Sequence, residues 1–471
     1  MSECLGLDVG TTTVKAVVIE SETGAVVRRA TAPNDSEMTS PEDKCAGRSE
    51  WDPDRILAVA QQVLSEVGSD TVRAVGVTGQ MHGMLLVDGC GRPIGPFIGW
   101  QDQRGAEPKP DSNRTLVADL IERLDTSDPA GHVCRPKTGY MGATLSWLLA
   151  YDQVPAGSRA CFLPDFVSSR LTDTLPVSDP TNAAGSGLYD VAAGQFHPPF
   201  AELSESSLLP DVVPSGFRAG ELKTSWPDSG LRSGIPVGVA SGDNQASFLG
   251  SVREPVKTVL INVGTGGQMS VSATTPDAGP GLEARPHVNG AYILVGPGLV
   301  GGRTYAWLRD FFLEVGRKVF GVEEDPEAVY DRMTELADLI ESGAEGLTAE
   351  PLLTGTREDP HRRGRLDGIG TANFTSGHLS RAVLEGIAEQ FRILYESALK
   401  VGAGRRSILV GAGNGIRKNP VLREIVEQQF EMEMRIPIHT EEAAYGAAMQ
   451  AMVLCGAKKS LKEAAEIIRY E

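Results

Sequence analysis

The chain lacks the features that mark secreted and membrane proteins. Its six cysteines are scattered without a CxxC pair, which argues against a disulfide framework or a cysteine metal site. No apolar run reaches the ~18 residues that a membrane-spanning helix needs. The first residues, MSECLGLDVG, have neither the basic nor the apolar region of a secretory signal. These absences predict a protein of the reducing cytoplasm without a membrane partner.

Basic residues are also in short supply. The chain has 44 Lys and Arg against 62 Asp and Glu, a formal net charge of −18, and no basic run that could grip a phosphate backbone. Nucleic acid is therefore not an expected partner. The pattern GxxxxGK[ST] is absent as well, which excludes the conventional P-loop mode of ATP binding.

Glycine, in contrast, is abundant, with 54 residues among 471. This share is well above the usual value of about 7%, and much of the excess lies in GG, GxG and GT clusters, which suit tight turns and ligand loops. The length exceeds that of one ordinary core and predicts two domains. We place them at 1–249 and 250–471. Strands alternate with helices and each half begins with a hairpin, which indicates an α/β fold.

One hairpin pattern occurs twice. Residues 5–20 read LGLDVGTTTVKAVVIE and residues 259–274 read VLINVGTGGQMSVSAT. In each copy a short apolar strand meets Val-Gly-Thr, and a second strand follows. The first copy continues into a third predicted strand at 25–30. Such a turn offers backbone N–H groups and hydroxyls to an anion. Two of these hairpins facing each other can clamp one nucleoside triphosphate.

The two copies differ at one position, where Asp8 in the first corresponds to Asn262 in the second. Only the first copy carries a carboxylate that can hold Mg²⁺ through water while the loop holds phosphate. The alternative is a turn residue that caps the hairpin. The duplication favours the magnesium role.

A second carboxylate, Asp243 in VASGDNQAS, follows a predicted strand at 237–240. Ligand sites in open α/β sheets gather at such strand ends. Asp243 can accept the proton of a hydroxyl that attacks a γ-phosphoryl group. It can equally cap the following helix. On spacing alone the cap is the better interpretation.

Three further short segments contain polar or glycine residues that could contact a ligand. GQMHG places Gln80 and His82 after a predicted strand at 72–78, and WQDQR contains Trp100 and Asp102. These side chains can contact a sugar, but a locally satisfied histidine and a loop anchored by one tryptophan explain them too. GAGNG, late in the chain, lacks dinucleotide spacing and suits adenine or ribose packing on glycine backbone.

The longer periodic segments predict helices. An apolar stripe predicts a helix at 51–67 and another at 304–320. The strongest pattern covers 376–400, with Ser376 as the expected N-cap and Gly402 just beyond its end. A strand at 407–410 precedes GAGNG. A further helix is expected to begin at Asn419-Pro420.

Taken together, these segments resemble the FGGY carbohydrate kinases of the actin-like ATPase superfamily. The resemblance runs over nearly the whole chain, in the family's order, through GLDVGTTTVK, GVTGQMHG, WQDQR, SDPTNAAGSGLYD, ASGDNQAS, INVGTGGQ, GGRTYAWLRDFF, LVGAGNGIRKNPVLREI and EEAAYGAAMQA. GQMHG followed by Trp-x-Asp-x-Arg is similar to the ketose-kinase branch rather than to glycerol kinase. WQDQR, the Gln of GDNQAS and GAGNGIRKNPVLREI look closer to sedoheptulokinases. SDPTNAAG and the Asn of GDN look xylulokinase-like.

The resemblance implies two actin-like (ribonuclease H-like) domains with a deep interdomain cleft, and ATP and Mg²⁺ as cofactors. It makes Asp243 the general base, against the cap interpretation, and gives Asp8 to Mg²⁺. The nucleotide-binding residues it implies are Gly10, Thr11, Thr12, Gly264, Thr265, Gly266, Gly302, Gly411, Gly413 and Asn419. The sugar-binding residues it implies are Gln80, Met81 (through its backbone), His82, Trp100, Asp102, Asp243 and Asn244.

The expected reaction is phosphorylation of the terminal primary hydroxyl of a ketose, with sedoheptulose favoured and xylulose as the alternative. Dimers are common in the family, so a homodimer is an expectation. A non-enzymatic alternative is an actin-like ATPase that acts on a protein partner, but such a protein would not need the sugar-side motifs. A sugar sensor without catalysis would not need both Asp8 and Asp243.

Overall fold

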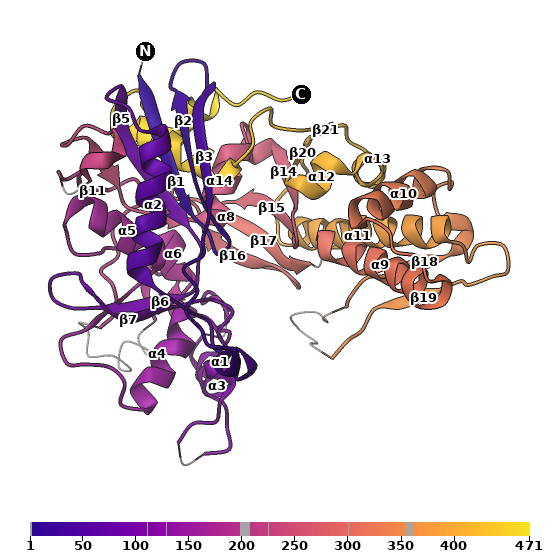
Figure 1. The fold of residues 1–471 in the computed structure, drawn as a ribbon, viewed down its shortest axis with the longest axis horizontal. Coiled ribbons are helices and arrows are strands. Elements are labelled where there is room, and N and C mark those ends of the chain that lie inside the picture. The colour runs from indigo at the N-terminus through magenta and orange to yellow at the C-terminus, as the bar shows by residue number, and fades with distance from the viewer. Residues whose placement is uncertain are drawn as a thin grey trace.

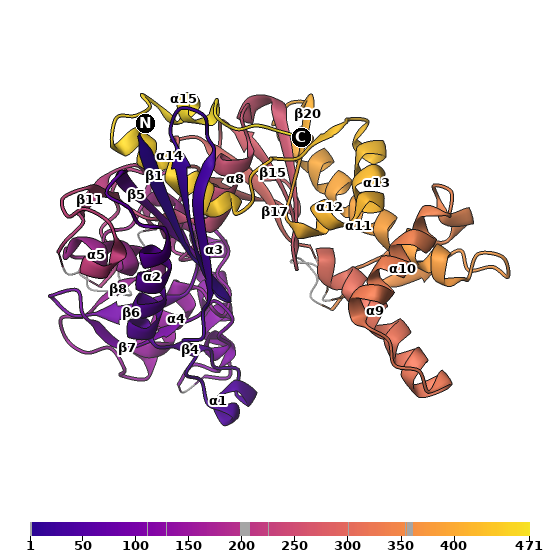
Figure 2. The same cartoon turned by 45° about the horizontal axis from the view of Figure 1, so that its top comes forward.

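Two lobes, each built around its own mixed β-sheet, lie side by side in the computed structural model (Figure 1). The structure describes residues 2–110, 112–128, 130–197, 208–224, 226–299, 301–353, 355 and 361–471. Turned to bring its top forward, the molecule shows the same two lobes (Figure 2). The sheets and helices together confirm the predicted two-domain α/β fold.

The first-lobe sheet has the strand order β11-β12-β5-β1-β2-β3, with β13 also paired to β5. Its strands are β1 (Glu3–Val9), β2 (Thr13–Glu20), β3 (Val26–Pro33), β5 (Val72–Gly79), β11 (Arg218–Glu221), β12 (Pro236–Gly238) and β13 (Ser241–Gly242). The first three form the predicted antiparallel meander, and β5 joins β1 in parallel.

The second-lobe sheet repeats this arrangement. Its order is β16-β17-β15-β14-β20-β21. Its strands are β14 (Thr258–Val263), β15 (Gly267–Ala273), β16 (Glu283–Pro286), β17 (Tyr292–Leu299), β20 (Ile408–Ala412) and β21 (Met434–Arg435). Here β14 pairs antiparallel with β15 and parallel with β20, as β1 does with β2 and β5. The duplicated hairpin therefore belongs to a duplicated sheet.

The predicted helices appear with shifted ends. The first is α2 (Pro53–Val67), which begins after Asp52 because the Asp52 carboxylate caps two N–H groups of its first turn. The long helix is α11 (Ser376–Lys400), but its N-cap is Thr375, so the expected cap at Ser376 is wrong by one residue. The next is α9 (Gly301–Val315), which starts earlier than expected and continues as a π-helical turn.

The remaining elements complete the two lobes. The other helices are α1 (Pro41–Cys45), α3 (Leu116–Ser127), α4 (Met141–Ala150), α5 (Leu163–Thr172), α6 (Pro180–Ala184), α8 (Asp243–Ser251), α10 (Pro326–Asp338), α12 (Asn414–Lys418), α13 (Pro420–Phe430), α14 (Glu442–Leu454) and α15 (Leu461–Ala465). The minor strands are β4 (Glu50–Trp51), β6 (Met84–Val87), β7 (Pro93–Ile98), β8 (Arg159–Cys161), β9 (Tyr189–Asp190), β10 (Gln195–Phe196), β18 (Thr348–Glu350) and β19 (Arg365–Asp367). Among the described helices, none is both long and apolar enough to cross a bilayer.

Helix α14 comes from the end of the chain but packs on the first-lobe sheet (Figure 1). Successive strand residues alternate between two hydrophobic clusters: Leu5 and Val18 pack with α2, whereas Cys4 and Ile19 pack with α14. This alternation places the two helices on opposite faces of the sheet. A domain boundary near residue 250 stays a prediction, and α14 shows that the second half of the chain also builds the first lobe.

The contact between α14 and the sheet is unusually close. A Cβ added at Gly6 would overlap the carbonyl oxygen of Ala444, and one at Gly76 would overlap that of Ala447. The helix also meets α8 closely, because a Cβ at Gly446 would overlap the carbonyl oxygen of Ala246. At these three positions the backbones approach so closely that only glycine fits.

This packing predicts that Gly76→Ala destabilises the fold by about 1–3 kcal/mol, the usual cost of overpacking a dense core. Thermal unfolding followed by circular dichroism measures the effect. Gly89→Ala is the matched control, because a Cβ there meets nothing within 4 Å. Equal melting temperatures for the two variants would contradict the close packing.

Candidate active site

Three neighbouring parallel strands of the first lobe end at one edge. Asp8 on β1 pairs with Thr78 on β5, and Thr78 pairs with Ser241 on β13. Adjacent strands lie about 4.8 Å apart, so the backbones of Asp8 and Ser241 are roughly 10 Å apart. The segments that follow these strands therefore lie close together at this edge of the sheet. They are the turn of the first phosphate hairpin, the GQMHG loop and the start of α8 at Asp243.

Asp8 has the character of a cation ligand. Its Oδ1 atom is buried and has no hydrogen-bond partner among the described residues. Burial, followed by the negative charge of Asp243, raises the pKa of Asp8 to about 7, while Lys15 acts in the opposite direction. An unpartnered buried carboxylate oxygen beside a second carboxylate is stabilised by a bound cation. The turn-cap interpretation has no hydrogen bond to support it.

The residues present fit Mg²⁺ rather than a metal held by a protein cage. Within the described ranges, no group of three or more His, Cys, Asp or Glu side chains could hold an ion. Mg²⁺ usually keeps several waters and takes one or two carboxylates together with substrate phosphates. Asp8 would supply such a carboxylate, next to the hairpin that is predicted to hold the phosphates.

Asp243 is the first residue of α8, and the cap interpretation from spacing is wrong. The N-cap is Gly242, and the Asp243 Oδ1 atom accepts the adjacent N–H of Asn244 at 2.7 Å, which is not a helix-capping hydrogen bond. Burial raises the pKa of Asp243 to about 6, although that N–H and the charge of Arg285 act in the opposite direction. A carboxyl group with this pKa is ionised at neutral pH and accepts a proton readily.

Thr11 connects the phosphate hairpin to the predicted sugar side. Its hydroxyl donates to Gln80 Oε1 at 3.0 Å and accepts from Trp100 Nε1 at 3.0 Å. The Gln80 Nε2 atom is buried and has no partner among the described residues, so it offers a donor to a ligand oxygen. The Trp100 side chain is 45% exposed and leaves a ring face to solvent. The structure therefore brings these three predicted residues together.

His82 and Met81 lie in the same loop. His82 adopts a positive φ of 79°, and its ring stacks on Tyr140 at 3.9 Å. Its Nδ1 atom lies 2.9 Å from the carbonyl oxygen of Gly185, and because a carbonyl only accepts, Nδ1 carries the proton. Met81 is buried. The imidazole is thus held in one orientation by the protein.

Asp102 has a different environment from that predicted. It is fully buried, and its two oxygens accept hydrogen bonds from Ser49 N and from Arg104 N, Nε and Nη2, at 2.8–3.0 Å. Four donors fill the roughly four acceptor positions of a carboxylate. A sugar contact from Asp102 stays a prediction, and this geometry argues against it. The side chain orients Arg104 and the loop that carries Trp100.

In the second lobe the phosphate hairpin is joined to the start of α9. Gly264 N donates to Gly266 O, while Gly302 N donates to Gly264 O and Arg303 N to Thr265 O at 3.0 Å. A Cβ at Gly302 would lie 2.5 Å from the oxygen of Gly264, so only glycine allows this approach. A Cβ at Gly264 meets nothing within 4 Å, which leaves that side of the loop open to a ligand.

The glycine-rich turn after β20 reaches the same hairpin. Gly413 has a φ of 81°, and a Cβ there would lie 2.5 Å from the carbonyl oxygen of Val263. Gly411, in contrast, lies inside β20 and packs on Met434. Asn419 is fully buried and caps α13 by accepting Leu422 N at 2.9 Å. For Gly411 and Asn419 the structure shows packing and capping, while Asn419 Nδ2 is buried without a partner among the described residues, and the predicted nucleotide contacts stay predictions.

Hydrogen bonds between Asn244, Gln268 and Arg285 bridge the two lobes, and the sequence did not predict them. Asn244 donates from Nδ2 to Gln268 Oε1 at 2.7 Å and accepts from Arg285 Nη1 at 3.4 Å. Gln268 corresponds to Val14 in the first hairpin copy. A polar residue at a position that is apolar in the other copy could have indicated a polar contact of this side chain. Arg285 gave no such signal. The bridge links the helix that carries Asp243 to the second phosphate hairpin.

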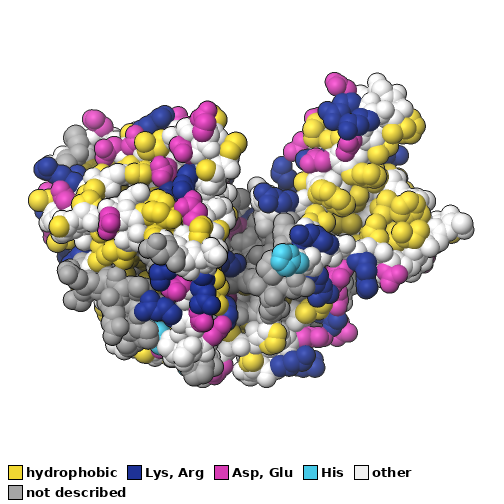
Figure 3. All heavy atoms as spheres, turned by 90° about the horizontal axis from the view of Figure 1, so that it is seen from below, with side chains coloured by type: hydrophobic (Ala, Val, Ile, Leu, Met, Phe, Trp, Pro, Cys, Tyr) yellow, Lys and Arg dark blue, Asp and Glu magenta, His cyan; other side chains and the backbone are white. Residues whose placement is uncertain are grey.

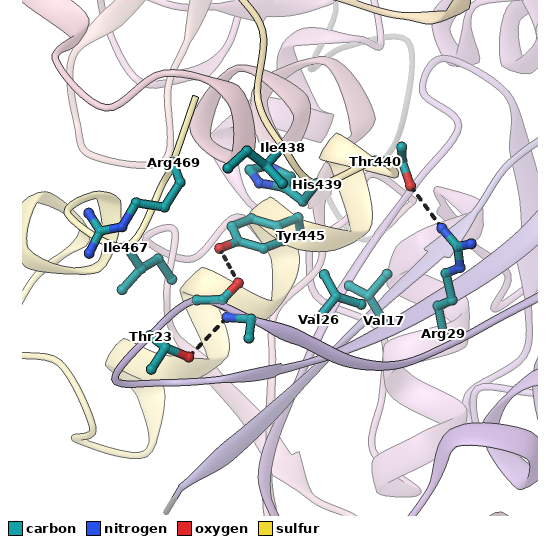
Figure 4. Close-up of a pocket in the computed structure, with 12 residues that line it drawn as sticks. Val17, Thr23, Val26, Arg29, Ile438, His439, Thr440, Tyr445, Ile467 and Arg469 are labelled. Atoms are coloured by element: carbon teal, nitrogen blue, oxygen red, sulfur yellow. Dashed lines mark hydrogen bonds between the residues drawn. The ribbon is translucent and has the colours of Figure 1, made fainter. Parts of the chain in front are cut away.

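The space between the lobes is visible on the surface. Seen from below, the molecule is hollowed between them (Figure 3). A separate pocket of about 430 Å³ lies between the β2–β3 turn and the C-terminal segments around residues 438–445 and 467–469 (Figure 4). At this pocket Arg29 donates to the Thr440 hydroxyl, and the Tyr445 hydroxyl donates to the carbonyl oxygen of Gly24. None of the predicted site residues lines this pocket. Asp243 is adjacent to Asn244, whose side chain contacts Gln268 of the second lobe.

Two related lobes, each with a phosphate-type hairpin, and a polar site with two carboxylates on one of them define an ATP-dependent kinase of the actin-like architecture. The family models agree. The N-terminal domain model of the FGGY family of carbohydrate kinases matches residues 4–250, and the C-terminal domain model matches residues 259–455. The chain belongs to this family and is an ATP-dependent carbohydrate kinase.

Relatives of different sugar specificity are about equally similar. The chain is 27% identical to sedoheptulokinase of Mus musculus, over 94% of this chain and 96% of that protein. It is 28% identical to L-fuculokinase of Escherichia coli (strain K12), over 99% and 95%. The structure of ligand-bound xylulose kinase from Lactobacillus acidophilus superposes with a TM-score of 0.83 at 20% identity, covering 100% of this chain and 93% of that one. This last likeness concerns the fold.

The raised pKa of Asp243 predicts how activity depends on pH. The carboxylate is ionised above about pH 6 and protonated below it, so the base is lost as the pH falls. With saturating Mg-ATP, kcat/KM for the sugar should be flat near neutrality and fall about tenfold per pH unit below the pKa. A pH–rate profile measures this. An acid limb at the ordinary aspartate pKa of about 4 would contradict the predicted environment.

Proposed function

We propose that this kinase transfers the γ-phosphoryl group of ATP to the terminal primary hydroxyl of a ketose, with sedoheptulose as substrate and sedoheptulose 7-phosphate as product. The observation that carries the proposal is the position of Asp243, a partly buried carboxylate at the edge where Asp8 and the first phosphate hairpin also end. Resemblance of WQDQR and GDNQAS to sedoheptulokinases supports the choice of sugar.

In the proposed reaction Asp243 accepts the proton of the attacking hydroxyl. As the proton leaves, the hydroxyl oxygen forms its bond to the γ-phosphorus, and the bond to the bridging oxygen of ADP breaks. Backbone N–H groups of the two hairpins hold the phosphates in line with that oxygen. Magnesium bound beside Asp8 would supply positive charge that compensates the phosphate oxygens.

The sugar side orients the acceptor. The Gln80 amide offers an unpartnered donor, and the Trp100 ring offers an exposed face beside it. Since Thr11 contacts both side chains, the phosphate hairpin and the sugar site are held in one arrangement. Closure of the lobes would exclude water, which otherwise competes as acceptor. The Asn244–Gln268 bridge connects the lobes close to the reacting groups.

The base role predicts that Asp243→Asn lowers kcat by about 10²–10⁴-fold, the usual contribution of general base catalysis. The amide keeps the size of the carboxylate and one oxygen that can accept the Asn244 N–H, so the affinity for Mg-ATP should change little. Coupled ADP release and isothermal titration calorimetry measure the two quantities. Asp35→Asn is a control, because that side chain is 71% exposed on the surface. Lost ATP binding in a folded variant would contradict a role limited to the base.

The substrate is tested by ADP release with sedoheptulose, xylulose, ribulose, fructose and glycerol. The highest kcat/KM is expected for sedoheptulose. A preference for xylulose would replace the proposed substrate and leave the mechanism intact, as the SDPTNAAG and GDN segments favour that alternative. Turnover of none of them, with ATP still bound, would contradict the proposed acceptor class. The cytoplasmic location and the homodimer stay predictions of the sequence.

A further inference from the structure

Two cysteines from opposite ends of the chain meet in the first lobe. Cys4 lies on β1, and Cys455 is the residue that ends α14. They are 451 positions apart in the sequence, and their sulfur atoms are 3.6 Å apart. The other four cysteines, Cys45, Cys90, Cys134 and Cys161, have no sulfur contact with one another or with this pair.

Both backbones are held by regular structure, so the contact does not depend on a loose segment. Cys4 is paired with Ile19 in the β1–β2 ladder, and Cys455 N donates to Ala451 O at 3.0 Å as the last turn of α14 closes. Both sulfurs belong to the hydrophobic cluster between the sheet and α14. The close packing of that helix on the sheet therefore brings the two thiols together.

The two thiols differ in access and acidity. Cys4 is fully buried, whereas Cys455 is partly exposed and precedes Gly456, where an added Cβ meets nothing within 4 Å. The hydrogen bond between the thiols lowers the pKa of Cys455 and raises that of Cys4. The more accessible sulfur is thus also the more acidic of the two, and thiolate formation and access both govern reaction with oxidants.

We propose that Cys4 and Cys455 form an oxidative modification site that takes hydrogen peroxide or a related hydroperoxide and closes a disulfide between the two ends of the chain. The Cys455 thiolate attacks the peroxide, an S–O bond forms, the O–O bond breaks, and the leaving hydroxide takes a proton to become water. The Cys4 thiol then attacks this sulfenic sulfur, the S–S bond forms as the S–O bond breaks, and the released hydroxide takes the thiol proton to become a second water. Two thiols are oxidised by two electrons and one peroxide is reduced.

The cross-link would stabilise the fold without reaching the reacting groups. It closes a very long loop and so restricts the unfolded chain. Cys4 precedes Asp8 by four strand residues, a distance of about 13 Å along β1. Kinase activity should therefore persist in the oxidised protein, and the inference does not depend on which sugar is the substrate.

The experiment uses the full chain with Cys45→Ser and Cys90→Ser, which removes the two exposed thiols. Reduced protein is treated with equimolar hydrogen peroxide, alkylated and digested with trypsin. Cleavage after Lys15, Arg435 and Lys458 places Cys4 in peptide 1–15 and Cys455 in peptide 436–458, each as its single cysteine. The expected results are a loss of two hydrogen masses, a 1–15/436–458 cross-link and a higher melting temperature, all reversed by dithiothreitol.

Two variants in the same background separate the proposal from simple oxidation. Cys455→Ser should show neither the cross-link nor the rise in melting temperature. Cys4→Ser keeps a hydrogen-bond donor beside Cys455 and removes the resolving sulfur, so it should leave Cys455 as a sulfenic acid that a dimedone reagent captures. Peroxide-treated protein in which Cys455 gains oxygen without the cross-link, or in which another cysteine forms the disulfide, would overturn the proposal.

Discussion

The close packing of α14 on Gly6 and Gly76 is the contact on which the other features depend. One face of this helix lies against β1 and β5, and it also packs on α8 through Gly446. Asp8 is the next-to-last residue of β1, and Asp243 begins α8. A helix from the end of the chain therefore holds in place the two elements that carry the carboxylates. Any residue larger than glycine at these contacts would move one of them relative to the other.

The site places negative charge where burial disfavours it. Burial raises the pKa values of both Asp8 and Asp243, and the negative charge of Asp243 adds to the cost of ionising Asp8. A cation bound at Asp8 would compensate this negative charge and would leave Asp243 free to accept a proton. The neighbouring Asp102 shows the contrast, since four donors satisfy its buried carboxylate. All three residues are aspartates. The number of hydrogen-bond donors around each carboxylate decides whether it is satisfied within the protein, as Asp102 is, or has an oxygen without a partner, as Asp8 has.

Much of the fold was predictable because its signals are local. Apolar alternation and periodicity located β1, β2, β5, α2 and α11, and the repeated Val-Gly-Thr turn indicated two related lobes. Helix ends were less accurate, as with the cap at Thr375, because several hydroxyl residues can serve and only the backbone conformation selects one. The cap that Asn419 gives to α13 and the packing of Gly411 on Met434 were not predictable from spacing, since they depend on burial in the folded chain.

The sequence by itself determined the class of the protein: a duplicated α/β kinase whose motifs occur in a set order, with one hairpin that keeps Asp8 and one that has Asn262. Hairpins, glycine turns and strand ends are properties of neighbouring residues, so they can be read along the chain. Only the tertiary structure decided which side chains meet across it. The register of three parallel strands joins Asp8 to Asp243, the lobes meet through Asn244 and Gln268, and α14 brings Cys455 to Cys4. These contacts arise from packing between segments hundreds of residues apart, which no local pattern records.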